Sequence, residues 1–375
     1  MECKVKMRLT RAEISLSNLK YNYLNIRKKV SNKPILAVVK ADAYGHGMIN
    51  VVAALEKLDD KKPSYYGVAL LEEALELRKS KTTQCPILVF APLKFDEIED
   101  YINNKIIPTL TSQYEINKLL KYEFKKKFKV HINIDTGMGR VGIPFQNAAN
   151  LIDELSKNRM IQISGLYTHF ATADESNKKF ANIQLARFNN VINSLKEKKI
   201  EIGIIHSANS GAIIDIPESY FDMVRAGISL YGYYPSNETS ESIKLKPVMS
   251  LISEVATVKT FPKGTPISYG RRYKTKNETN IISVPIGYAD GIRRGLTNKM
   301  FCIIGNKKYQ QVGTVTMDRI MFDIGKSNVK IGEKVIILGK SKNEIITATE
   351  WCNILKTIPY EITCGISKRV PRKYI

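Results

Sequence analysis

The sequence predicts an α/β protein, a (β/α)8 barrel of the TIM type followed by a mostly-β C-terminal domain. Two observations lead to this prediction. Between about residues 34 and 232, short apolar runs alternate with segments of helical period. Beyond about residue 240, β-rich runs are punctuated by Gly, Asn and Pro, and long helical patterns are almost absent. A chain of 375 residues is long enough for one large domain and a second, smaller one.

The predicted barrel strands are continuous apolar runs rather than alternating ones. This pattern is typical of parallel strands that are covered on both faces. A doubly wound sheet is the alternative, but no Gly-x-Gly-x-x-Gly sequence follows the first strand, so we favour the barrel. The eight candidate strands lie at 34–40, 65–70, 85–90, 105–110, 128–135, 161–170, 202–209 and 221–232.

Amphipathic helices are predicted between these strands. In 48–60, apolar residues recur at helical spacing and form one stripe. In 111–124, Ser112 is predicted as the N-cap, with Glu115 at the position that completes a capping box. Such helices would cover the outside of the barrel.

A polar stretch at 231–248 separates the two predicted domains. We therefore assign 1–240 to the barrel and 241–375 to the β domain, and we expect about the first ten residues to pair with the β domain. The β domain is expected to contribute to the active site of a partner subunit.

Composition limits the function classes. The net charge of +22 comes from lysines spread along the chain, without the arginine–aromatic pattern of a nucleic-acid binder. We therefore expect no nucleic-acid partner. The five cysteines form no Cys-x-x-Cys pair, which argues against a structural metal site and favours a reducing, cytoplasmic location. No apolar run reaches the roughly 18 residues of a membrane helix, and no membrane partner is expected.

Polar side chains collect at the ends of the predicted strands. The carboxyl ends of barrel strands share one rim, where barrel active sites form. Five residues are expected on that rim: Lys40, Arg140, His169, His206 and Arg225. The sequence therefore predicts a cation-rich site there.

These residue types suit amine chemistry. A lysine in an apolar, cation-rich pocket loses part of its proton affinity and becomes a nucleophile for an aldehyde. Tyr44, Ser207 and the backbone at Gly227 are candidates for holding a phosphate group. Both pyridoxal phosphate and a phosphorylated sugar aldehyde fit this combination, so the residues alone leave a pyridoxal phosphate enzyme and a Schiff-base aldolase open.

Seven motifs in order along the chain resemble the bacterial, pyridoxal 5'-phosphate-dependent alanine racemases. They are "AVVKADAYGHG", "IDTGMGRVGI", "RAGISLYG", "ISYGRRY", "IGYADG", "VTMDRIM" and "PYEITCGISKRVPR". The resemblance implies an N-terminal (β/α)8 barrel, a C-terminal β domain and a homodimer whose active sites take residues from both chains. It also implies interconversion of L- and D-alanine, which supplies D-alanine for peptidoglycan.

The resemblance implies two catalytic bases. Lys40 would carry the cofactor and act on one face of the substrate α-carbon, and Tyr269 of the partner subunit would act on the other face. Racemisation needs two such groups because a proton leaves one face and returns on the opposite one. We expect His169 and Arg225 to supply the positive charge that a tyrosine base needs.

The remaining site residues are also assigned by resemblance. Arg225 would face the pyridine nitrogen of the cofactor, supported by His206. Arg140 and Met317 would bind the substrate, with Asp318 in a supporting position. The cofactor-binding positions implied are Lys40, Tyr44, His169, Ser207, Arg225, Gly227, Ile228 and Tyr360.

Asn133 departs from the pattern of the family. Many members have a carbamylated lysine at this position, whose negative charge orients the arginine of "DTGMGR". An amide cannot be carbamylated, and an unpaired guanidinium is costly to bury. We therefore expect a small anion such as chloride between Asn133 and Arg140.

Two other pyridoxal phosphate proteins remain as alternatives. A decarboxylase of basic amino acids would place an acidic residue at the pyridine nitrogen, where this chain has Arg225. A single-barrel pyridoxal phosphate-binding protein would lack the β domain and Tyr269. Among racemases, Tyr360 favours alanine over serine as the substrate.

Overall fold

The computed structural model describes residues 9–375, which form two compact units. One unit spans residues 19–246, and the other combines residues up to 18 with 247–375. We name them the barrel unit and the β unit. Most of the predicted pairing of the first ten residues concerns residues 1–8, which lie outside the described part of the chain.

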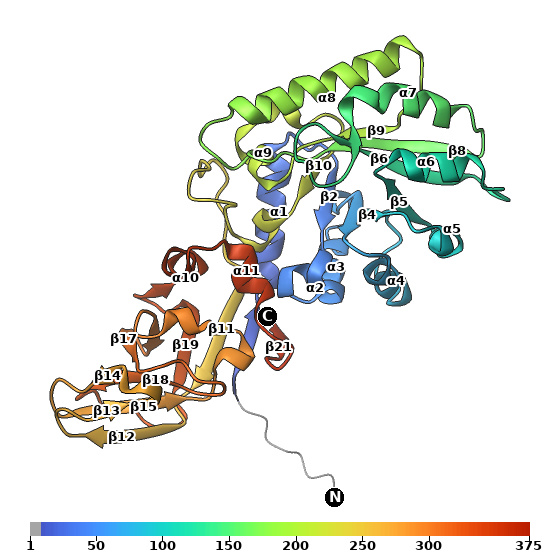
Figure 1. Ribbon diagram of the computed structural model, residues 1–375. Coiled ribbons are helices and arrows are strands. Elements are labelled where there is room, and N and C mark those ends of the chain that lie inside the picture. The colour runs from blue at the N-terminus through green and yellow to red at the C-terminus, as the bar shows by residue number, and fades with distance from the viewer. Residues whose placement is uncertain (1–8) are drawn as a thin grey trace, which may run out of the picture. The chain divides into compact units, whose positions relative to one another are not determined.

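The barrel unit contains a parallel sheet whose strand order is β10-β2-β3-β4-β5-β6-β8-β9, with β7 added beside β6 (Figure 1). A parallel bridge between His206 and Met223 links the two ends of this path and completes the barrel. The predicted (β/α)8 barrel is confirmed. Its strands are β2 (Ile35–Val38), β3 (Tyr65–Val68), β4 (Ile87–Pro92), β5 (Ile106–Leu110), β6 (Phe128–Asp135), β7 (Ile143–Pro144), β8 (Ile161–Thr168), β9 (Ile204–His206) and β10 (Val224–Ala226).

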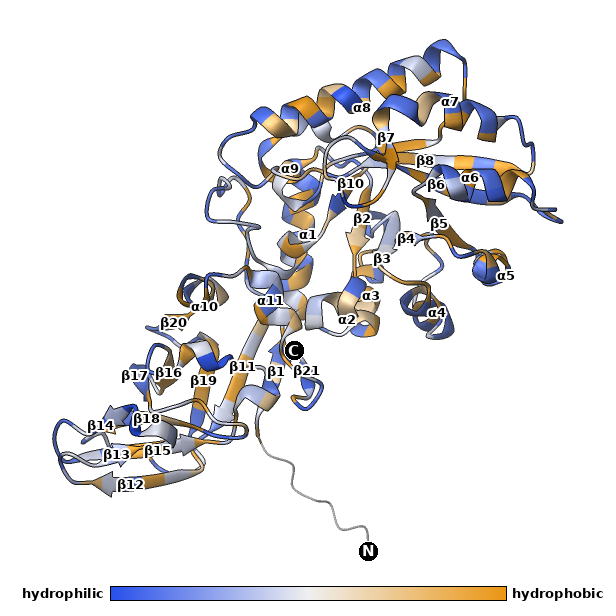
Figure 2. Cartoon of the chain, viewed as in Figure 1, coloured by the Kyte–Doolittle hydropathy of each residue, from blue (hydrophilic) through white to orange (hydrophobic). Residues whose placement is uncertain are grey.

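Helices surround these strands, and Figure 2 shows apolar residues concentrated in the strands while the helices are mixed. Every residue of β2 and β5 is buried, as the continuous apolar runs predicted. Ser112 caps α6 as predicted, since its hydroxyl accepts a hydrogen bond from the Glu115 N–H. The helices are α1 (Leu16–Lys29), α2 (Lys40–Gly45), α3 (Met48–Glu56), α4 (Leu71–Lys79), α5 (Ile98–Asn103), α6 (Gln113–Leu120), α7 (Phe145–Ser156), α8 (Lys179–Glu197) and α9 (Ser210–Asp215).

The β unit is built on a mostly antiparallel sheet with the order β12-β15-β18-β17-β16-β19-β11-β1-β21. The predicted mostly-β C-terminal domain is confirmed. Its strands are β1 (Arg11–Ile14), β11 (Met249–Glu254), β12 (Thr257–Phe261), β13 (Pro266–Ile267), β14 (Tyr273–Lys274), β15 (Thr279–Val284), β16 (Phe301–Ile304), β17 (Lys307–Val312), β18 (Ile320–Gly325), β19 (Lys334–Lys340), β20 (Ile345–Ile346) and β21 (Arg372–Tyr374), and its helices are α10 (Ala348–Leu355) and α11 (Pro359–Cys364).

β1 joins the β unit although it precedes the barrel in sequence. It pairs antiparallel with β11 and parallel with β21. Pairing between the two ends of the chain is non-local, and the apolar pattern of a four-residue strand does not reveal its partner.

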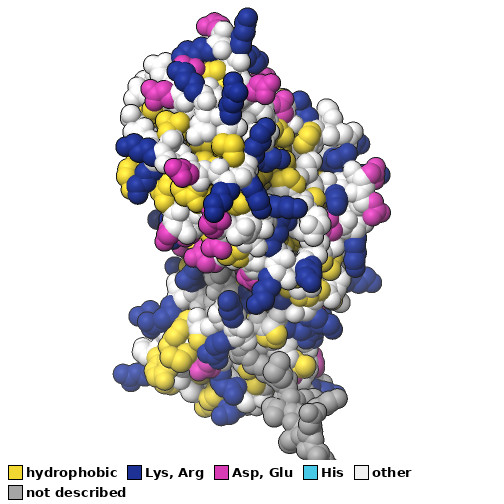
Figure 3. Space-filling view, turned by 90° about the vertical axis from the view of Figure 1, so that its right-hand side faces the viewer, with side chains coloured by type: hydrophobic (Ala, Val, Ile, Leu, Met, Phe, Trp, Pro, Cys, Tyr) yellow, Lys and Arg dark blue, Asp and Glu magenta, His cyan; other side chains and the backbone are white. Residues whose placement is uncertain are grey.

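Within residues 9–375, no helix is long and apolar enough to cross a membrane, and no group of three or more His, Cys, Asp or Glu side chains is placed to hold a metal ion. Lys and Arg side chains are scattered over the face shown in Figure 3, with acidic and apolar groups among them.

Candidate active site

Lys40 lies at the start of an unusual turn. β2 ends at Val38, so Lys40 is two residues beyond the strand rather than its last residue, which corrects the sequence-based placement. Each of the next four residues, 41–44, has φ between +52° and +54°, and none is glycine. A left-handed backbone costs roughly 1–2 kcal/mol per L-residue, so the surrounding structure must hold this turn in place.

Three polar side chains hold the turn. The Glu73 carboxylate on α4 accepts a 2.6 Å hydrogen bond from the Ala41 N–H, next to Lys40. The Asp42 carboxylate accepts a 2.7 Å bond from the Met48 N–H, at the start of α3. The Nδ1 atom of His46, which is fully buried, lies 2.9 and 3.0 Å from two carbonyl oxygens of the turn. Asp42 and His46 stand in the lysine motif, and the structure gives them a role in shaping the backbone beside Lys40.

Arg225 is buried on β10 and surrounded by neutral acceptors. Its Nη1 atom donates to His206 Nδ1 at 3.0 Å and to the His206 carbonyl at 3.1 Å. Its Nη2 atom faces the Thr168 carbonyl at 2.8 Å, the Ser207 carbonyl at 2.9 Å and His169 Nδ1 at 3.2 Å. Among the described residues, no carboxylate contacts Arg225, and its Nε–H has no acceptor. We call the residues around Arg225 the arginine cage.

Burial lowers the pKa of Arg225 to about 10, which still leaves the guanidinium protonated at neutral pH. The pKa of His169 lies well below its usual value because of burial, and because the charges of Arg225, Arg140 and Lys40 disfavour a further positive charge. His169 is therefore neutral in the single chain, and of the two residues expected to supply positive charge, Arg225 is the one that carries it. The charges of Arg225, Arg140 and Lys40 therefore all act on the His169 ring.

Gln184 on α8 fixes the backbone that carries His169. Its amide nitrogen donates to the His169 carbonyl at 3.1 Å, and its amide oxygen accepts from the Ala171 N–H at 2.9 Å. Gln184 is fully buried, so both halves of its amide need partners. The sequence did not suggest this residue, because a glutamine on an amphipathic helix is ordinarily exposed.

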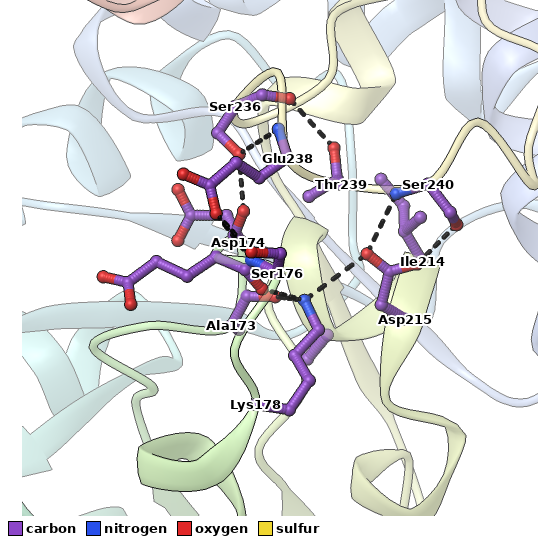
Figure 4. A network of polar contacts seen from close by, with 12 residues as sticks. Ala173, Asp174, Ser176, Lys178, Ile214, Asp215, Ser236, Glu238, Thr239 and Ser240 are labelled. Atoms are coloured by element: carbon purple, nitrogen blue, oxygen red, sulfur yellow. Dashed lines mark hydrogen bonds and ion pairs between the residues drawn. The ribbon is translucent and has the colours of Figure 1, made fainter.

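The loop that follows His169 is tied to the chain that follows β10 (Figure 4). Lys178 Nζ donates to the Ala173 carbonyl at 2.8 Å and lies 3.5 Å from the Asp215 carboxylate. Asp215 also accepts from the Ser240 N–H at 3.1 Å, and Glu238 accepts from the Ser176 N–H at 2.7 Å. These contacts hold together the loop after His169, α9 and the segment that follows η4 (Ile228–Tyr231).

A small cradle lies where β10 turns into the 3-10 helix η4 (Ile228–Tyr231). A Cβ atom on Gly227 would come within 3.1 Å of the Tyr44 hydroxyl and 3.4 Å of Ser210 Oγ. The Gly227 N–H donates to Ser210 Oγ at 3.0 Å. Backbone N–H groups and hydroxyls therefore converge here, as an anion requires.

The two serines of "IHSANSG" have different positions. Ser210 begins α9 and faces the cradle. Ser207, the serine predicted from the sequence, is fully buried and donates its hydroxyl to the Ser219 carbonyl at 2.7 Å. The structure thus places Ser210, and not Ser207, beside Tyr44 and Gly227.

Asn133 lies two residues before the "DTGMGR" segment, and Arg140 is the last residue of that segment. Asn133 is buried on β6, and its Oδ1 atom has no hydrogen-bond partner in the described chain. The Asp135 carboxylate folds the loop by accepting from the Gly137 N–H at 2.9 Å. Arg140 is exposed in this single chain, so the premise that its guanidinium is buried does not hold here.

Tyr269 and Met317 lie on one open hollow of the β unit, of about 740 Å³. Their exposed fractions are 76% and 51%, large values for such apolar side chains. Thr314 braces the Tyr269 backbone by donating to its carbonyl at 2.6 Å, and Ser268, just before Tyr269, has φ of +65°. The tyrosine is held by its backbone while its ring stays exposed.

The other two predicted residues also lie in the β unit. Asp318 follows Met317 and forms a 2.7 Å ion pair with Arg369. Tyr360 lies in the first turn of α11, directly after Pro359.

Comparison with known proteins shows which family this chain belongs to. The model of the alanine racemase N-terminal domain matches residues 14–235, and that of the alanine racemase C-terminal domain matches residues 248–374. The chain belongs to the alanine racemase family. Membership makes it an amino-acid racemase, which is a kind of isomerase.

Relatives of the alanine racemase family match over nearly the whole chain. An alanine racemase of Clostridium tetani is 44% identical, over 97% of this chain and 95% of the relative. The structure of an alanine racemase of Clostridium difficile 630 superposes with a TM-score of 0.90 at 39% identity, covering 99% of this chain and 97% of the other. A histidine racemase of Leuconostoc mesenteroides has a TM-score of 0.89 at 26% identity, covering 99% of both chains.

Proposed function

We propose that this chain is a pyridoxal 5'-phosphate-dependent racemase that interconverts L- and D-alanine, and that it supplies D-alanine for peptidoglycan. The observation that supports this proposal most strongly is the arginine cage. Arg225 is 3% exposed, stays protonated and is held only by neutral groups, with one N–H to spare. A decarboxylase would need a carboxylate in its place.

The residues of the rim fit pyridoxal phosphate. When bound, this cofactor withdraws electrons from the substrate α-carbon and so makes its proton acidic. Lys40 would hold the cofactor through its amine, and the spare Nε–H of Arg225 would face the ring nitrogen. Because arginine does not release its proton, that nitrogen would stay unprotonated, which would moderate electron withdrawal and favour return of the proton over side reactions.

The cradle fits the cofactor's phosphate. Tyr44 and Ser210 would supply hydroxyls, and the backbone at Gly227 and Ile228 would supply N–H groups at the start of η4, that of Gly227 being shared with Ser210 Oγ. We propose Ser210 in place of Ser207 as the phosphate ligand, because the Ser207 hydroxyl is already donated to a backbone carbonyl. Tyr360 remains a proposed fifth ligand.

We propose that two bases act on opposite faces of the α-carbon. Lys40 moves the proton on one face, and Tyr269 of a second copy of the chain moves it on the other. The exposed ring of Tyr269 on a braced backbone supports an arrangement in which another molecule covers it. The working unit would then be a homodimer with shared sites.

The other predicted residues keep their proposed roles. Arg140 and the Met317 backbone would bind the substrate carboxylate, with Asp318 behind Met317. A chloride ion near Asn133 is still expected in the assembled site, where Arg140 would lose its exposure. Removal of halide should then lower activity, whereas equal activity in chloride-free buffer would exclude the ion.

The experiment that tests the proposed function combines two measurements on the purified protein. Circular dichroism follows racemisation of alanine, serine, lysine, arginine and histidine, and absorbance follows the yellow colour of bound pyridoxal phosphate. Histidine is included because a histidine racemase shares this fold. We expect a yellow protein that racemises alanine fastest. A colourless protein, or faster turnover of another amino acid, would refute the proposal.

A further inference from the structure

His131 is a buried histidine that the proposed mechanism does not use. It lies in the middle of β6 and is fully buried. Its Nδ1 atom lies 3.1 Å from Nε2 of His206, the same ring that contacts Arg225 through Nδ1. The three side chains therefore form a continuous line from the arginine cage into the interior of the barrel.

The direction of the hydrogen bonds along this line follows from donor chemistry. An arginine can only donate, so His206 Nδ1 must accept and carries no hydrogen. A neutral His206 then carries its hydrogen on Nε2 and donates it to His131 Nδ1. His131 in turn carries its hydrogen on Nε2, an atom that is buried with no partner in the described chain.

Both histidines are neutral, as this scheme requires. Burial, together with the charge of Arg225, lowers the pKa of His131 to about 3. Burial also takes the pKa of His206 well below its usual value, with Arg225 and His131 acting in the same direction. A second proton on His206 would leave Arg225 facing another donor.

The fold reserves space for the His131 ring. A Cβ atom on Gly165, on the neighbouring strand β8, would lie only 2.4 to 2.6 Å from three atoms of the ring. The pairing of β6 with β8 also shifts register between Val130 and His131. A glycine and a strand irregularity at the same place indicate that the backbone is adapted to this side chain.

We propose that His131 is a positioning residue for Arg225: it accepts the Nε2–H of His206 and so keeps the Nδ1 lone pair of His206 directed at the guanidinium. Without this acceptor, His206 would bury an unsatisfied N–H, and a turn of its ring would relieve that cost by breaking the contact with Arg225. Since no carboxylate contacts Arg225 within residues 9–375, its orientation depends on such neutral acceptors. The consequence for catalysis rests on the proposed function.

The test begins with the hydrogen bonds themselves. The chain has four histidines, so nitrogen-15 NMR of histidine-labelled protein can be assigned with single substitutions. We expect the wild-type His206 signals to show a neutral ring with its hydrogen on Nε2, before and after addition of pyridoxal phosphate. A His206 that is protonated on Nδ1, or on both nitrogens, would overturn the proposal.

Two variants separate positioning from packing. His131→Leu fills the space of the ring with an apolar side chain and removes the acceptor. His131→Asn keeps an acceptor near the Nδ1 position. We expect His131→Leu to change the His206 signals, to shift the visible band of the bound cofactor and to lower kcat about tenfold with little change in KM. His131→Asn should restore most of each property. Equal behaviour of the two variants would reduce His131 to a packing residue.

A third variant perturbs the hydrogen bond between His131 and His206 without removing a polar group. Gly165→Ala crowds the His131 ring, so we expect it to disturb the His206 signals in the same direction as His131→Leu. Unchanged His206 signals in a folded Gly165→Ala protein would contradict the proposal. The NMR result does not require racemisation, so a wild-type protein that shows the expected tautomers but no activity would refute the proposed function alone.

Discussion

The arginine cage and the Tyr269 hollow differ in how completely one chain builds them. Arg225 is 3% exposed, and the single chain supplies five contacts to its two Nη atoms. Tyr269 is 76% exposed, and its carbonyl accepts a hydrogen bond from Thr314. A single chain therefore completes the half of the proposed site that would hold a cofactor, and leaves the other half open to a second molecule.

Both proposed bases nevertheless share one backbone feature. Lys40 precedes a run of positive φ angles that begins at Ala41, and Tyr269 follows Ser268, whose φ is +65°. Strained backbone persists only where neighbours fix it, and it clusters at functional sites. Both proposed bases are therefore held by a constrained backbone. They differ in how much of the surrounding site the single chain supplies.

The largest effect is expected at Lys40. Lys40→Ala removes the amine that would hold the cofactor and act as one base, so we expect loss of the yellow colour and a fall in kcat of at least about 10³-fold. Absorbance and the circular dichroism assay measure both. Lys57→Ala, an exposed lysine at the end of α3, is the control and should keep colour and activity. A yellow, active Lys40→Ala protein would show that Lys40 neither holds the cofactor nor acts as a base.

The next effect tests the open half. Tyr269→Phe removes one hydroxyl from the exposed ring and leaves its backbone bracing intact. We expect the exchange of the α-hydrogen with deuterium to slow about 10²- to 10⁴-fold for one enantiomer of alanine and far less for the other. Tyr288→Phe, in the same hollow, should produce no such asymmetry. Equal slowing of both enantiomers by Tyr269→Phe would show that this tyrosine is not a base.

A smaller effect is expected at the turn beside Lys40. The two oxygens of Glu73 have separate roles, because Oε1 accepts from the Ala41 N–H and Oε2 accepts from the Ala69 and Leu70 N–H groups that precede α4. Glu73→Gln places an NH₂ group against one of these donors, so we expect about tenfold weaker binding of pyridoxal phosphate. Titration of the cofactor, followed by absorbance, measures this.

Glu72→Gln provides the matched control for that variant. Glu72 is exposed and lies next to Glu73 in the first turn of α4. Glu72→Gln therefore removes the same charge from the N-terminus of the helix. Its cofactor affinity should match the wild type. If both variants weaken binding equally, the charge on α4 matters and the hydrogen bond to Ala41 does not.

The sequence was a good guide to the barrel because the information is local. Continuous apolar runs such as 128–135 and 161–170 reappear as β6 and β8, and His169 directly follows the end of β8. The pairing of β1 with β21 could not be predicted in this way. The two strands have only four and three residues, and neither sequence specifies a partner more than 300 residues away.

Within the site, the sequence indicated residue types better than directions. It could not choose between Ser207 and Ser210, since the choice depends on where β9 ends and α9 begins. The left-handed turn after Lys40 is also hidden, because no residue in 41–44 is a glycine. His131 has no feature in the sequence that separates it from the other residues of β6, because its contact with His206 is non-local.

The smallest effect concerns stability. The pKa values of His131, His169 and His206 are lowered, chiefly by burial, so the folded chain does not take up protons on these rings at mildly acid pH. The unfolded chain does so below about pH 6.5. Stability is therefore fully present above this pH and falls as the pH drops toward the folded values, by roughly 1 kcal/mol per histidine at about pH 5.5.

Urea unfolding at two pH values measures this loss of unfolding free energy. The same measurement on a His131 variant shows how much of the loss comes from the histidine that contacts His206. We expect His131→Asn to reduce the fall in unfolding free energy between about pH 7.5 and 5.5 by roughly a third, because one of the three neutral rings is gone. Tyr269→Phe removes no buried histidine, so it should leave the pH dependence of the unfolding free energy unchanged. A pH dependence that is unaltered in His131→Asn would mean that His131 takes up a proton in the folded state, and the neutral line from Arg225 would then be wrong.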